Sequence, residues 1–373
     1  MHIVLFLTYG NSFRTWKTAG ILERELALYK AHIDNGIQLT VISYGKTADE
    51  TNLIQNVNCE VRYNRWKLPT PIYGLLVPVL HFKTFIGADI LKSNQMYGAH
   101  IISRVSKIFH KPWILRQGYS FADHTTRSFG RTSTKAINAE RYEKRYLKEA
   151  TRLIFSAEEL AQIASKKYLL PECKYKVVPN YILTEFWSPQ YQARPMFEPY
   201  KGVFFGRFVG QKNLQSLIKS CEGLNVELYL IGDGLQAGEL ADLSVDCGVA
   251  CHFTGRLEQN AVKSILSNAD FFVLPSFYEG HPKALIESMC FGIPVLAADS
   301  PGINSIVIDG ETGILVAPTV DGLRSGIIKF SNLDENERRR LGMAARNWVV
   351  ERFSLSNAVS LESEVIQSIH SRS

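Results

Sequence analysis

Cysteine is scarce in this 373-residue sequence. Its six cysteines stand at 59, 173, 221, 247, 251 and 290, and none belongs to a Cys-x-x-Cys pair. A disulfide framework or a cysteine-based zinc site would need denser or paired cysteines, so neither is indicated. Cys247 and Cys251 are close enough in sequence to face one another, but we expect them to be small buried hydrophobic residues. Unpaired cysteines fit a reducing cytoplasm.

Long apolar runs are missing as well. The longest, residues 72–80, is well short of the roughly 18–20 residues that span a membrane, and it contains Gly74 and Pro78. Residues 1–7 have neither a basic leader nor a small-residue cleavage site, so we expect a first strand there and not a signal peptide. With 46% hydrophobic and 21% charged residues, the composition is typical of a soluble globular protein, and the length predicts two domains.

Several motifs of nucleotide and hydrolase chemistry are also absent. No Gly-x-Gly-x-x-Gly follows the first expected strand of either half, and no Gly-x-x-x-x-Gly-Lys-Ser/Thr occurs. This disfavours a dinucleotide-dependent dehydrogenase and a P-loop NTPase. There is no Gly-x-Ser-x-Gly nucleophile turn and no Asp-x-Asp or histidine cluster that requires a metal, so we expect no metal and no cofactor.

The net charge of +6 conceals two unlike halves. Residues 1–185 hold 26 Lys and Arg against 15 Asp and Glu, whereas residues 186–373 hold 16 against 21. The excess is densest from Arg127 to Arg152, where eight basic residues meet three acidic ones. Such a segment suits an anionic membrane surface or a phosphorylated ligand, and a solvated basic helix remains the alternative.

Strands and helices are expected to alternate in the first half. Residues 3–7 form a strand, 8–19 a polar loop and 20–35 a helix with leucines and other apolar residues at helical spacing. Gly36 then fits a left-handed helix end. Further buried strands are expected at 37–43, 88–92, 112–116 and 152–156.

The alternation restarts in the second half after a polar, Pro-rich linker at 187–199. Alternating strands and helices predict a parallel sheet with helices on both faces. We therefore predict the α/β class, with doubly wound domains at 1–184 and 185–354 and ligands at the carboxyl ends of strands facing an inter-domain cleft. Strands are expected at 202–206, 226–231, 250–254, 270–275 and 294–298, and helices near 213–221, 236–247, 258–267 and from 282.

The segment Glu279-Gly280-His281-Pro282 and the helix after it carry the strongest indication of a ligand site. Gly280 lets a ligand approach the backbone, and Pro282 suits the first turn of a helix, whose free N–H groups attract anions. Glu287 lies roughly 7–8 Å further along the axis at 1.5 Å per residue. Two carboxylates so spaced fit hydroxyls on two sugar rings; a loop Glu plus an exposed helix Glu is the alternative.

A pair of cations follows the first strand of the second half. Arg207 and Lys212 lie in a glycine-containing loop that opens a helix. Arg207 suits a two-pronged phosphate contact, and Lys212 offers a compact charge. Cations here would stabilise the charge that builds on a departing diphosphate, although a basic surface loop remains possible.

In order and spacing, these segments resemble the retaining glycosyltransferases of the GT4 group, which have the GT-B architecture of two Rossmann-like domains. The resemblance covers nearly all of residues 178–352. The matching segments are Gly206-Arg207, Lys212-Asn213-Leu214, Leu230-Ile231-Gly232-Asp233-Gly234, Phe253-Thr254-Gly255-Arg256-Leu257, Pro275-Ser276, Glu279-Gly280-His281-Pro282, Glu287, Gly292-Ile293-Pro294-Val295 and Asp309-Gly310-Glu311-Thr312-Gly313.

The resemblance implies a role for each donor-site residue. Arg207 and Lys212 would bind the donor diphosphate, Glu279 the transferred sugar and Glu287 the ribose, with Glu279, Arg207 and Lys212 acting in catalysis. The C-terminal helix, within 355–373, would pack back on the first, acceptor-binding domain. The remaining donor-binding residues implied are Gly20, Gly206, Arg256, Leu257, Gly280, His281, Pro282, Lys283, Ala284 and Leu285.

One part of the first half departs from the family pattern. Many relatives carry His-Gly after the strand that here ends at Arg116, whereas this chain has Gln117-Gly118. His100 and His124 are the candidates for the place of that histidine, and an ordinary packed or exposed side chain is the alternative for each.

The resemblance implies a metal-independent hexosyltransferase that moves a sugar from a nucleoside diphosphate sugar, such as a UDP-sugar, to an acceptor hydroxyl. A glycan or lipid-linked acceptor in bacterial surface polysaccharide, lipopolysaccharide or glycolipid synthesis is expected, with the enzyme cytoplasmic or peripheral at the membrane and without nucleic acid as a partner. A non-catalytic sugar-nucleotide-binding protein and a nucleotide-sugar epimerase are the alternatives.

Overall fold

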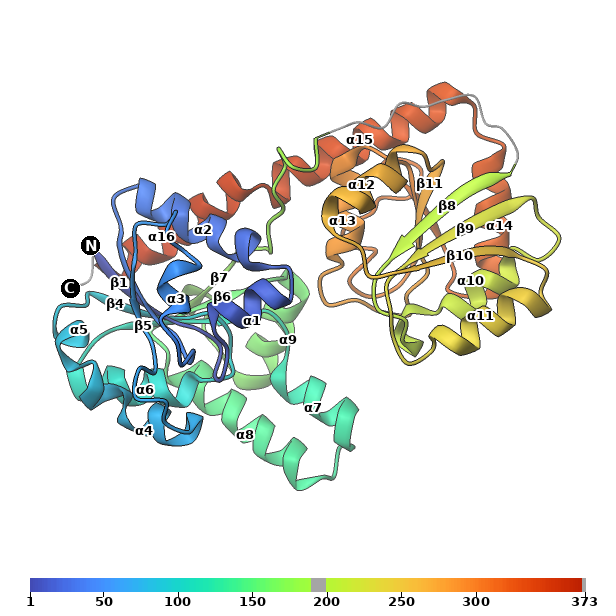
Figure 1. Ribbon diagram of the computed structural model, residues 1–373. Coiled ribbons are helices and arrows are strands. Elements are labelled where there is room, and N and C mark those ends of the chain that lie inside the picture. The colour runs from blue at the N-terminus through green and yellow to red at the C-terminus, as the bar shows by residue number, and fades with distance from the viewer. Residues whose placement is uncertain (189–198, 371–373) are drawn as a thin grey trace. The chain divides into compact units, whose positions relative to one another are not determined.

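The computed structural model describes residues 1–188 and 199–370 (Figure 1). The chain divides into two compact units: unit 1 comprises Met1–Asn180 and Leu355–Ser373, and unit 2 comprises Tyr181–Ser354. Most of the linker expected at 187–199 lies outside the described residues.

Unit 1 is built on a seven-stranded sheet in the order β3-β2-β1-β4-β5-β6-β7, and every neighbouring pair is parallel. Parallel sheets are covered on both faces, which explains why its strands read as apolar runs. The strands are β1 (His2–Phe6), β2 (Gln38–Ile42), β3 (Glu60–Arg62), β4 (Ile90–Ser93), β5 (Trp113–Gln117), β6 (Arg152–Phe155) and β7 (Tyr175–Val177).

One apolar core of unit 1 lies between this sheet and the helices α4, α6, α8 and α9, with Val4, Leu91 and Leu115 among its sheet residues. Helices α2 and α16 pack against each other, and α16 also contacts β6 and β7 (Figure 1). The helices are α1 (Phe13–Thr18), α2 (Leu22–Asp34), α3 (Asp49–Asn52), α4 (Thr70–Leu80), α5 (Phe82–Ile86), α6 (Ala99–Phe109), α7 (Phe121–Phe129), α8 (Thr134–Glu149), α9 (Glu158–Tyr168), η1 (Glu172–Lys174) and α16 (Leu355–His370).

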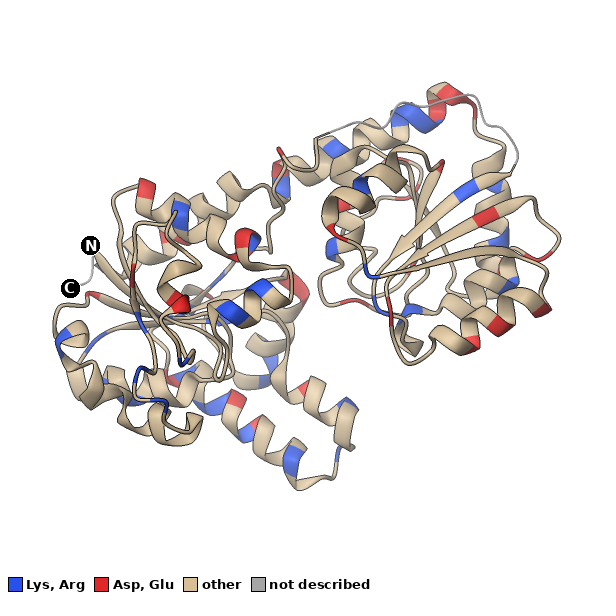
Figure 2. Ribbon diagram, in the orientation of Figure 1, with Lys and Arg blue, Asp and Glu red and all other residues tan. Residues whose placement is uncertain are grey.

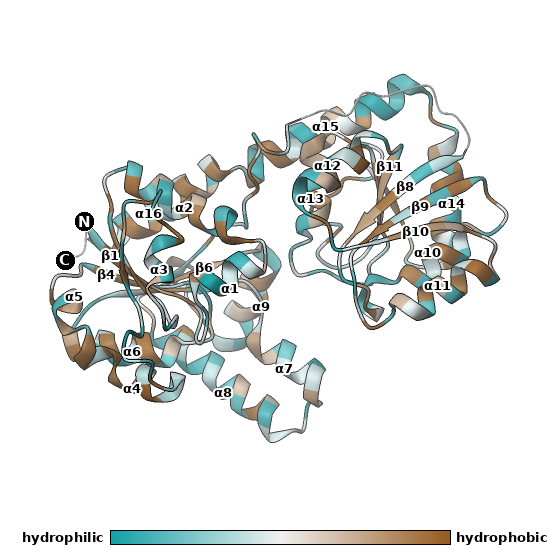
Figure 3. Ribbon diagram, viewed as in Figure 1, coloured by the Kyte–Doolittle hydropathy of each residue, from teal (hydrophilic) through white to brown (hydrophobic). Residues whose placement is uncertain are grey.

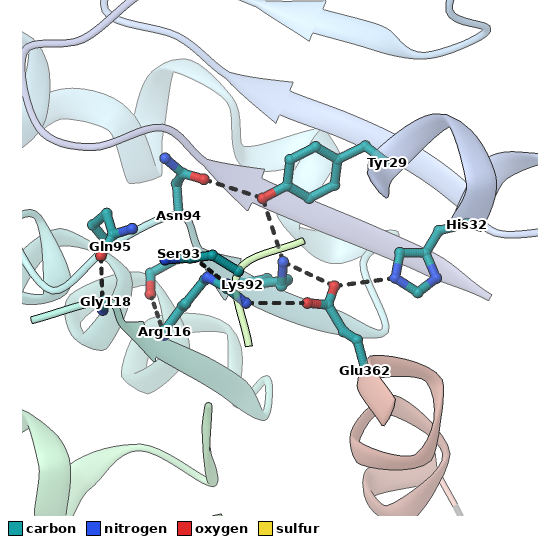
Figure 4. Close-up of polar contacts among 10 residues, drawn as sticks. Tyr29, His32, Lys92, Ser93, Asn94, Gln95, Arg116, Gly118 and Glu362 are labelled. Atoms are coloured by element: carbon teal, nitrogen blue, oxygen red, sulfur yellow. Dashed lines mark hydrogen bonds and ion pairs between the residues drawn. The ribbon is translucent and has the colours of Figure 1, made fainter. Parts of the chain in front are cut away.

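A buried ionic cluster attaches α16 to unit 1 (Figure 4). Successive residues of a strand point to opposite faces of the sheet, so Lys92 and Arg116 face away from the core that contains Leu91 and Leu115. Glu362 of α16 lies there, with its carboxylate 2.9 Å from Lys92 Nζ and 3.8 Å from Arg116. His32 of α2 is 3.1 Å from the same carboxylate. The attractive cations hold the pKa of Glu362 well below its usual range despite burial, which by itself raises it.

Unit 2 repeats this topology with a six-stranded parallel sheet in the order β10-β9-β8-β11-β12-β13. Its strands are β8 (Tyr200–Phe205), β9 (Val226–Ile231), β10 (Ala250–Gly255), β11 (Phe271–Leu274), β12 (Val295–Ala298) and β13 (Ile314–Val316). Its helices are η2 (Gly210–Lys212), α10 (Leu214–Ser220), α11 (Ala237–Asp246), α12 (Gln259–Ser267), α13 (Lys283–Phe291), α14 (Val320–Ser331) and α15 (Glu335–Phe353).

Two segments of unit 1 differ from expectation. The expected loop at 8–19 contains helix α1, which begins because the Ser12 hydroxyl accepts a hydrogen bond from Thr15 N and the Thr15 hydroxyl accepts one from Ser12 N. The apolar run at 72–80 is a helix, α4, in spite of Gly74 and Pro78. Within the described residues, no helix combines the length and apolar character that crossing a membrane requires.

Candidate functional site

Three glycines lie side by side at the carboxyl ends of neighbouring strands in unit 2. Gly206 follows β8, Gly232 follows β9 and Gly255 ends β10. Backbone hydrogen bonds continue across these ends, from Gly206 N to Ile231 O and from Gly232 N to Gly255 O. The carboxyl edge of a parallel sheet is where such folds bind ligands, so this edge positions the candidate site.

Close backbone approach explains why the turn after β9 needs glycine at two positions. Gly232 has φ +144°, a conformation that side chains rarely adopt, and a Cβ there would overlap the carbonyl oxygen of Gly206. A Cβ on Gly234 would likewise overlap the carbonyl of Phe208. The loop after β8 is thereby pressed against the loop after β9, which fixes the direction in which residues 206–212 leave the sheet.

Lys212 and Glu279 form a largely buried ion pair at this edge. Lys212 Nζ lies 2.5 Å from Glu279 Oε1, and their side chains are only 15% and 7% exposed. Lys212 comes from the turn after β8, and Glu279 from the loop after β11, the next strand in the sheet. The Lys212 side chain also passes Gly206, where a Cβ would be 3.8 Å from its Cε. Three predicted site residues are thus adjacent in the structure.

The loops that carry this pair are held together by hydrogen bonds. The Gln211 amide donates to Tyr278 O at 2.7 Å, and Phe277 N donates to Gln211 O at 3.0 Å. Asn213, buried and with φ +55°, donates its side-chain amide to Pro275 O and Pro318 O. These bonds keep Lys212 and Glu279 at a fixed separation without a ligand.

The start of the helix after Glu279 has no side-chain cap. Pro282 is the N-cap of α13 and has no capping side chain, so it leaves first-turn N–H groups such as those of Ala284 and Leu285 without a side-chain cap. Gly280 is exposed, with open space where a Cβ would be. The His281 ring lies 5.5 Å from that of Phe353.

The second carboxylate, Glu287, lies within α13 and is buried, not exposed. This burial argues against the alternative of an exposed helix residue. Lys283 is half-buried at the first position of the same helix.

Two further cations predicted for the site, Arg207 and Arg256, are exposed. Arg207 directly follows Gly206, while Arg256 and Leu257 follow β10. Because β9 separates β10 from β8, the strand ends that lead to Arg207 and Arg256 are about 10 Å apart, at about 4.8 Å per strand. Arg207 and Lys212 thus both follow β8, and Arg256 follows a strand further along the same edge.

The candidate residues of unit 1 have varied surroundings. Gly20 precedes α2 with φ +66° and is exposed. Gln117 ends β5 fully buried, and within the described residues its side-chain amide makes no hydrogen bond. His100 Nδ1 is 3.0 Å from the Tyr142 hydroxyl. The pKa of His100 is lowered, mainly by burial and to a smaller extent by the positive charge of Arg104. The His124 ring packs 5.6 Å from that of Tyr119.

Some residues that shape the site were not singled out from the sequence. Glu279 N donates to Pro301 O, and a Cβ on Gly302, with φ +81°, would overlap Glu279 O. The Ser300 hydroxyl donates to Ser276 O at 2.8 Å. A turn signal, Ser300-Pro301-Gly302, was present in the sequence, but its contact with Glu279 depends on the pairing of β11 with β12.

Metal-binding groups were sought across residues 1–188 and 199–370. No three His, Cys, Asp or Glu side chains come together there in a way that would hold an ion. All six cysteines are free thiols.

Comparison with known families concerns mainly unit 2. Residues 196–348 match the family model described as glycosyl transferases group 1. The second unit matches group 1 glycosyl transferases. This range contains Arg207, Lys212, Glu279 and Glu287.

Curated proteins that are similar in sequence to this chain are also named as sugar transferases. The GDP-mannose-dependent alpha-mannosyltransferase of Mycolicibacterium smegmatis is 30% identical over 170 residues, covering 46% of this chain and 42% of the relative. The UDP-Gal:alpha-D-GlcNAc-diphosphoundecaprenol alpha-1,3-galactosyltransferase of Escherichia coli is 26% identical over 292 residues, covering 72% and 75%. The chain thus spans about two fifths of the length of the first of these relatives.

Solved structures extend the likeness to the whole chain. Sucrose-phosphate synthase from Thermosynechococcus elongatus superposes with a TM-score of 0.77 at 18% identity, and the match covers 100% of both chains. This chain and that structure share two parallel-sheet α/β units, the GT-B fold. The fold predicted from the sequence is confirmed.

Proposed function

We propose that this protein is a retaining glycosyltransferase of the GT4 group that uses a nucleoside diphosphate sugar. The observation that carries the proposal is the buried Lys212–Glu279 pair, located between a glycine-rich strand edge and an uncapped helix start. A diphosphate needs fixed positive charge and free N–H groups, and a sugar needs a carboxylate that accepts hydrogen bonds from its hydroxyls. This edge offers all three within one unit.

Each residue has a defined part in the proposed reaction. Arg207 and Lys212 bind the diphosphate, Glu279 accepts hydrogen bonds from the transferred sugar, and the buried Glu287 accepts them from the ribose. The contact that Lys212 makes with Glu279 keeps both side chains in place before the donor arrives. When a diphosphate binds Lys212 in place of Glu279, a Glu279 oxygen becomes available to accept a hydrogen bond from a sugar hydroxyl.

Bond changes in the proposed step balance without a metal or cofactor. The bond between the anomeric carbon and the phosphate oxygen breaks, and a bond from that carbon to the acceptor oxygen forms on the same face. The acceptor proton passes to the departing phosphate. Arg207, Lys212 and the start of α13 stabilise the charge that builds on the phosphate, which is where electrostatic catalysis has its largest effect.

We further propose a UDP-sugar as donor and a lipid-linked or glycan acceptor in bacterial surface polysaccharide, lipopolysaccharide or glycolipid synthesis. The support is the Escherichia coli relative, whose name specifies a UDP-sugar donor and a diphosphoundecaprenol-linked acceptor. Unit 1 is the proposed acceptor domain.

A donor panel tests the proposal. Wild-type protein with labelled UDP- and GDP-sugars and a diphosphate-linked lipid acceptor is expected to give one labelled product with retained anomeric configuration, at a rate that EDTA does not change. Arg207→Ala is expected to lower kcat by about 10²–10³-fold, because it removes charge that stabilises the transition state. Turnover is measured by product chromatography.

Lys219→Ala is the matched control, since Lys219 is an exposed cation of the neighbouring helix α10 and lies outside the site. Its kcat is expected to equal that of the wild type. Unchanged turnover in Arg207→Ala would contradict the proposal. Nucleotide binding without product would instead favour a non-catalytic sugar-nucleotide-binding protein, and an altered free sugar nucleotide would favour an epimerase.

A further inference from the structure

Helix α4 is apolar on two opposite faces. Tyr73 and Val77 are fully buried in the core of unit 1. Leu75 and Val79, four residues apart on the other face, are 59% and 70% exposed, and Ile72 and Leu76 on that face are exposed too. An ordinary surface helix of a globular protein is polar on its outer face, so the outer face of α4 lacks the pattern expected of a helix that meets water.

The exposed apolar side chains continue beyond α4. Phe82 and Ile86, one turn apart on α5, are 48% and 61% exposed, and Trp66 precedes α4. Single exposed apolar residues are normal, but a contiguous set marks an interaction site. Figure 3 shows the brown of apolar residues over α4 and α5. We define the α4–α5 surface as Trp66, Ile72, Leu75, Leu76, Val79, Phe82 and Ile86.

Between Glu60 and Asp89, the segment that carries this surface has only basic charged side chains. Residues 61–88 contain Arg62, Arg65, Lys67 and Lys83 and no Asp or Glu. Arg62 is paired with Glu60 at 2.5 Å, whereas Arg65 and Lys83 form no ion pair within the described residues. An apolar partner protein would not explain this exclusion of acidic residues, but an anionic partner does.

A cavity of about 300 Å³ opens beside the apolar residues. Its lining includes Arg65, Lys83, Trp66 and His81. The Arg65 guanidinium lies 4.6 Å from the centre of the Trp66 ring, which holds the cation at the cavity. Burial and then the charges of Arg62 and Arg65 lower the pKa of His81 to about 4, so its ring is neutral at physiological pH and the positive charge of the cavity comes from arginine and lysine.

We propose that the α4–α5 surface binds an anionic phospholipid bilayer, with its apolar side chains at the boundary of headgroups and acyl chains and a lipid phosphate at Arg65 and Lys83. Interfacial helices combine an apolar face with flanking Lys and Arg in this way. The proposal goes beyond glycosyl transfer, since vesicle binding needs neither donor nor acceptor.

The basic segment Arg127–Arg152, for which the sequence predicted a membrane contact, is the weaker candidate. Its cations share α7 and α8 with acidic residues (Figure 2), and Glu149 pairs with both Arg145 and Lys107. Of its large apolar side chains, Phe129 and Ile137 are exposed, and the Phe129 ring lies 4.0 Å from Lys135 Nζ. This segment offers charge without a comparable apolar face.

Cosedimentation of the full-length protein with vesicles tests the proposal. We expect binding to vesicles of phosphatidylcholine with phosphatidylglycerol and at least tenfold weaker binding to phosphatidylcholine alone. The double variant Leu75→Ser/Val79→Ser is expected to lose at least tenfold in binding, and Arg65→Ala/Lys83→Ala is expected to lose the preference for the anionic vesicles. All four side chains are exposed, so the melting temperature should change little.

The matched control is Arg141→Ala/Lys144→Ala on α8, which is expected to bind vesicles within twofold of the wild type. Inorganic phosphate at matched ionic strength should compete no better than chloride, because the ligand is a phosphate anchored in a bilayer. Wild-type protein that fails to bind at low salt, or a Leu75→Ser/Val79→Ser variant that binds fully, would overturn the proposal. The proposal would also be overturned if the wild type is a dimer and Leu75→Ser/Val79→Ser is a monomer that does not bind vesicles, because the surface would then be a dimer interface. Donor turnover with a short soluble acceptor, measured in parallel, reports separately on the proposed function.

Discussion

At the scale of single residues, Lys212 and Glu279 are more than a stabilising pair. Two charges that leave water lose hydration, and a buried ion pair often stabilises a protein no better than apolar residues of the same size. The loops after β8 and β11 nevertheless hold both charges at 2.5 Å with the help of Gln211 and Asn213. A ligand that takes up both charges would account for their retention at this edge.

Gly232 gives a prediction at the same scale. Gly232→Ala is expected to destabilise unit 2 by about 2 kcal/mol or more, since the new Cβ would overlap Gly206 O and φ is +144°. Gly210→Ala is the control, because Gly210 has open space at that position. Urea unfolding of both variants measures the difference, and equal midpoints for the two would contradict the argument.

The residues of the candidate site could be proposed from the sequence, but their contacts could not. Lys212 and Glu279 are 67 residues apart, and only the pairing of β8 with β11 brings them together. Gly232 was visible as a strand-end turn, yet its need for glycine comes from the Gly206 carbonyl on another strand. Residue identity is local information, whereas the partner of a residue depends on sheet order.

At the scale of elements, helix α16 depends on Glu362. Glu362→Gln is expected to destabilise unit 1 by about 3–5 kcal/mol, because it leaves Lys92 and Arg116 buried without a counter-charge. Glu364→Gln is the matched control on the same helix: Glu364 pairs with Lys176 at an exposed site, and its loss is expected to cost at most about 1 kcal/mol. Denaturant unfolding measures both.

The pH dependence of this effect follows from the pKa of Glu362. Its pKa in the folded protein lies below the ordinary glutamate value of 4.5, so ionised Glu362 stabilises the fold above about pH 4.5. That contribution is lost as the pH falls from 4.5 through the folded pKa. The difference between the wild type and Glu362→Gln should therefore shrink as the pH falls below 4.5. A difference that grows on acidification would contradict this assignment.

Periodicity predicted the repeating strands and helices of both units, because parallel strands and the helices between them are apolar over their whole length or on one face. It missed α1, whose start depends on the reciprocal bonds of Ser12 and Thr15. It also gave no helix at α4, because a run that is apolar on both faces has no helical period to detect. Periodicity thus missed α1, which begins at a local capping interaction, and α4, which has an exposed apolar face.

At the scale of the whole molecule, unit 1 is discontinuous in sequence. Its sheet is complete by Val177, yet α16 returns to it after all of unit 2. Besides Glu362, α16 buries Val359, Val365 and Ile366. Burial of one such side chain contributes about 1.5–3 kcal/mol, so the helix supplies a large part of a typical net stability of 5–15 kcal/mol.

Truncation after Ser354 tests this dependence. The shortened chain keeps every residue of unit 2 but leaves Lys92 and Arg116 without Glu362, so we expect unit 1 to unfold while unit 2 stays folded. Hydrogen exchange measured by mass spectrometry should show lost protection in peptides from β4 and β5 and unchanged protection in those from β8 and β9. Protection retained in β4 and β5 would show that unit 1 folds without its last helix and would contradict the prediction.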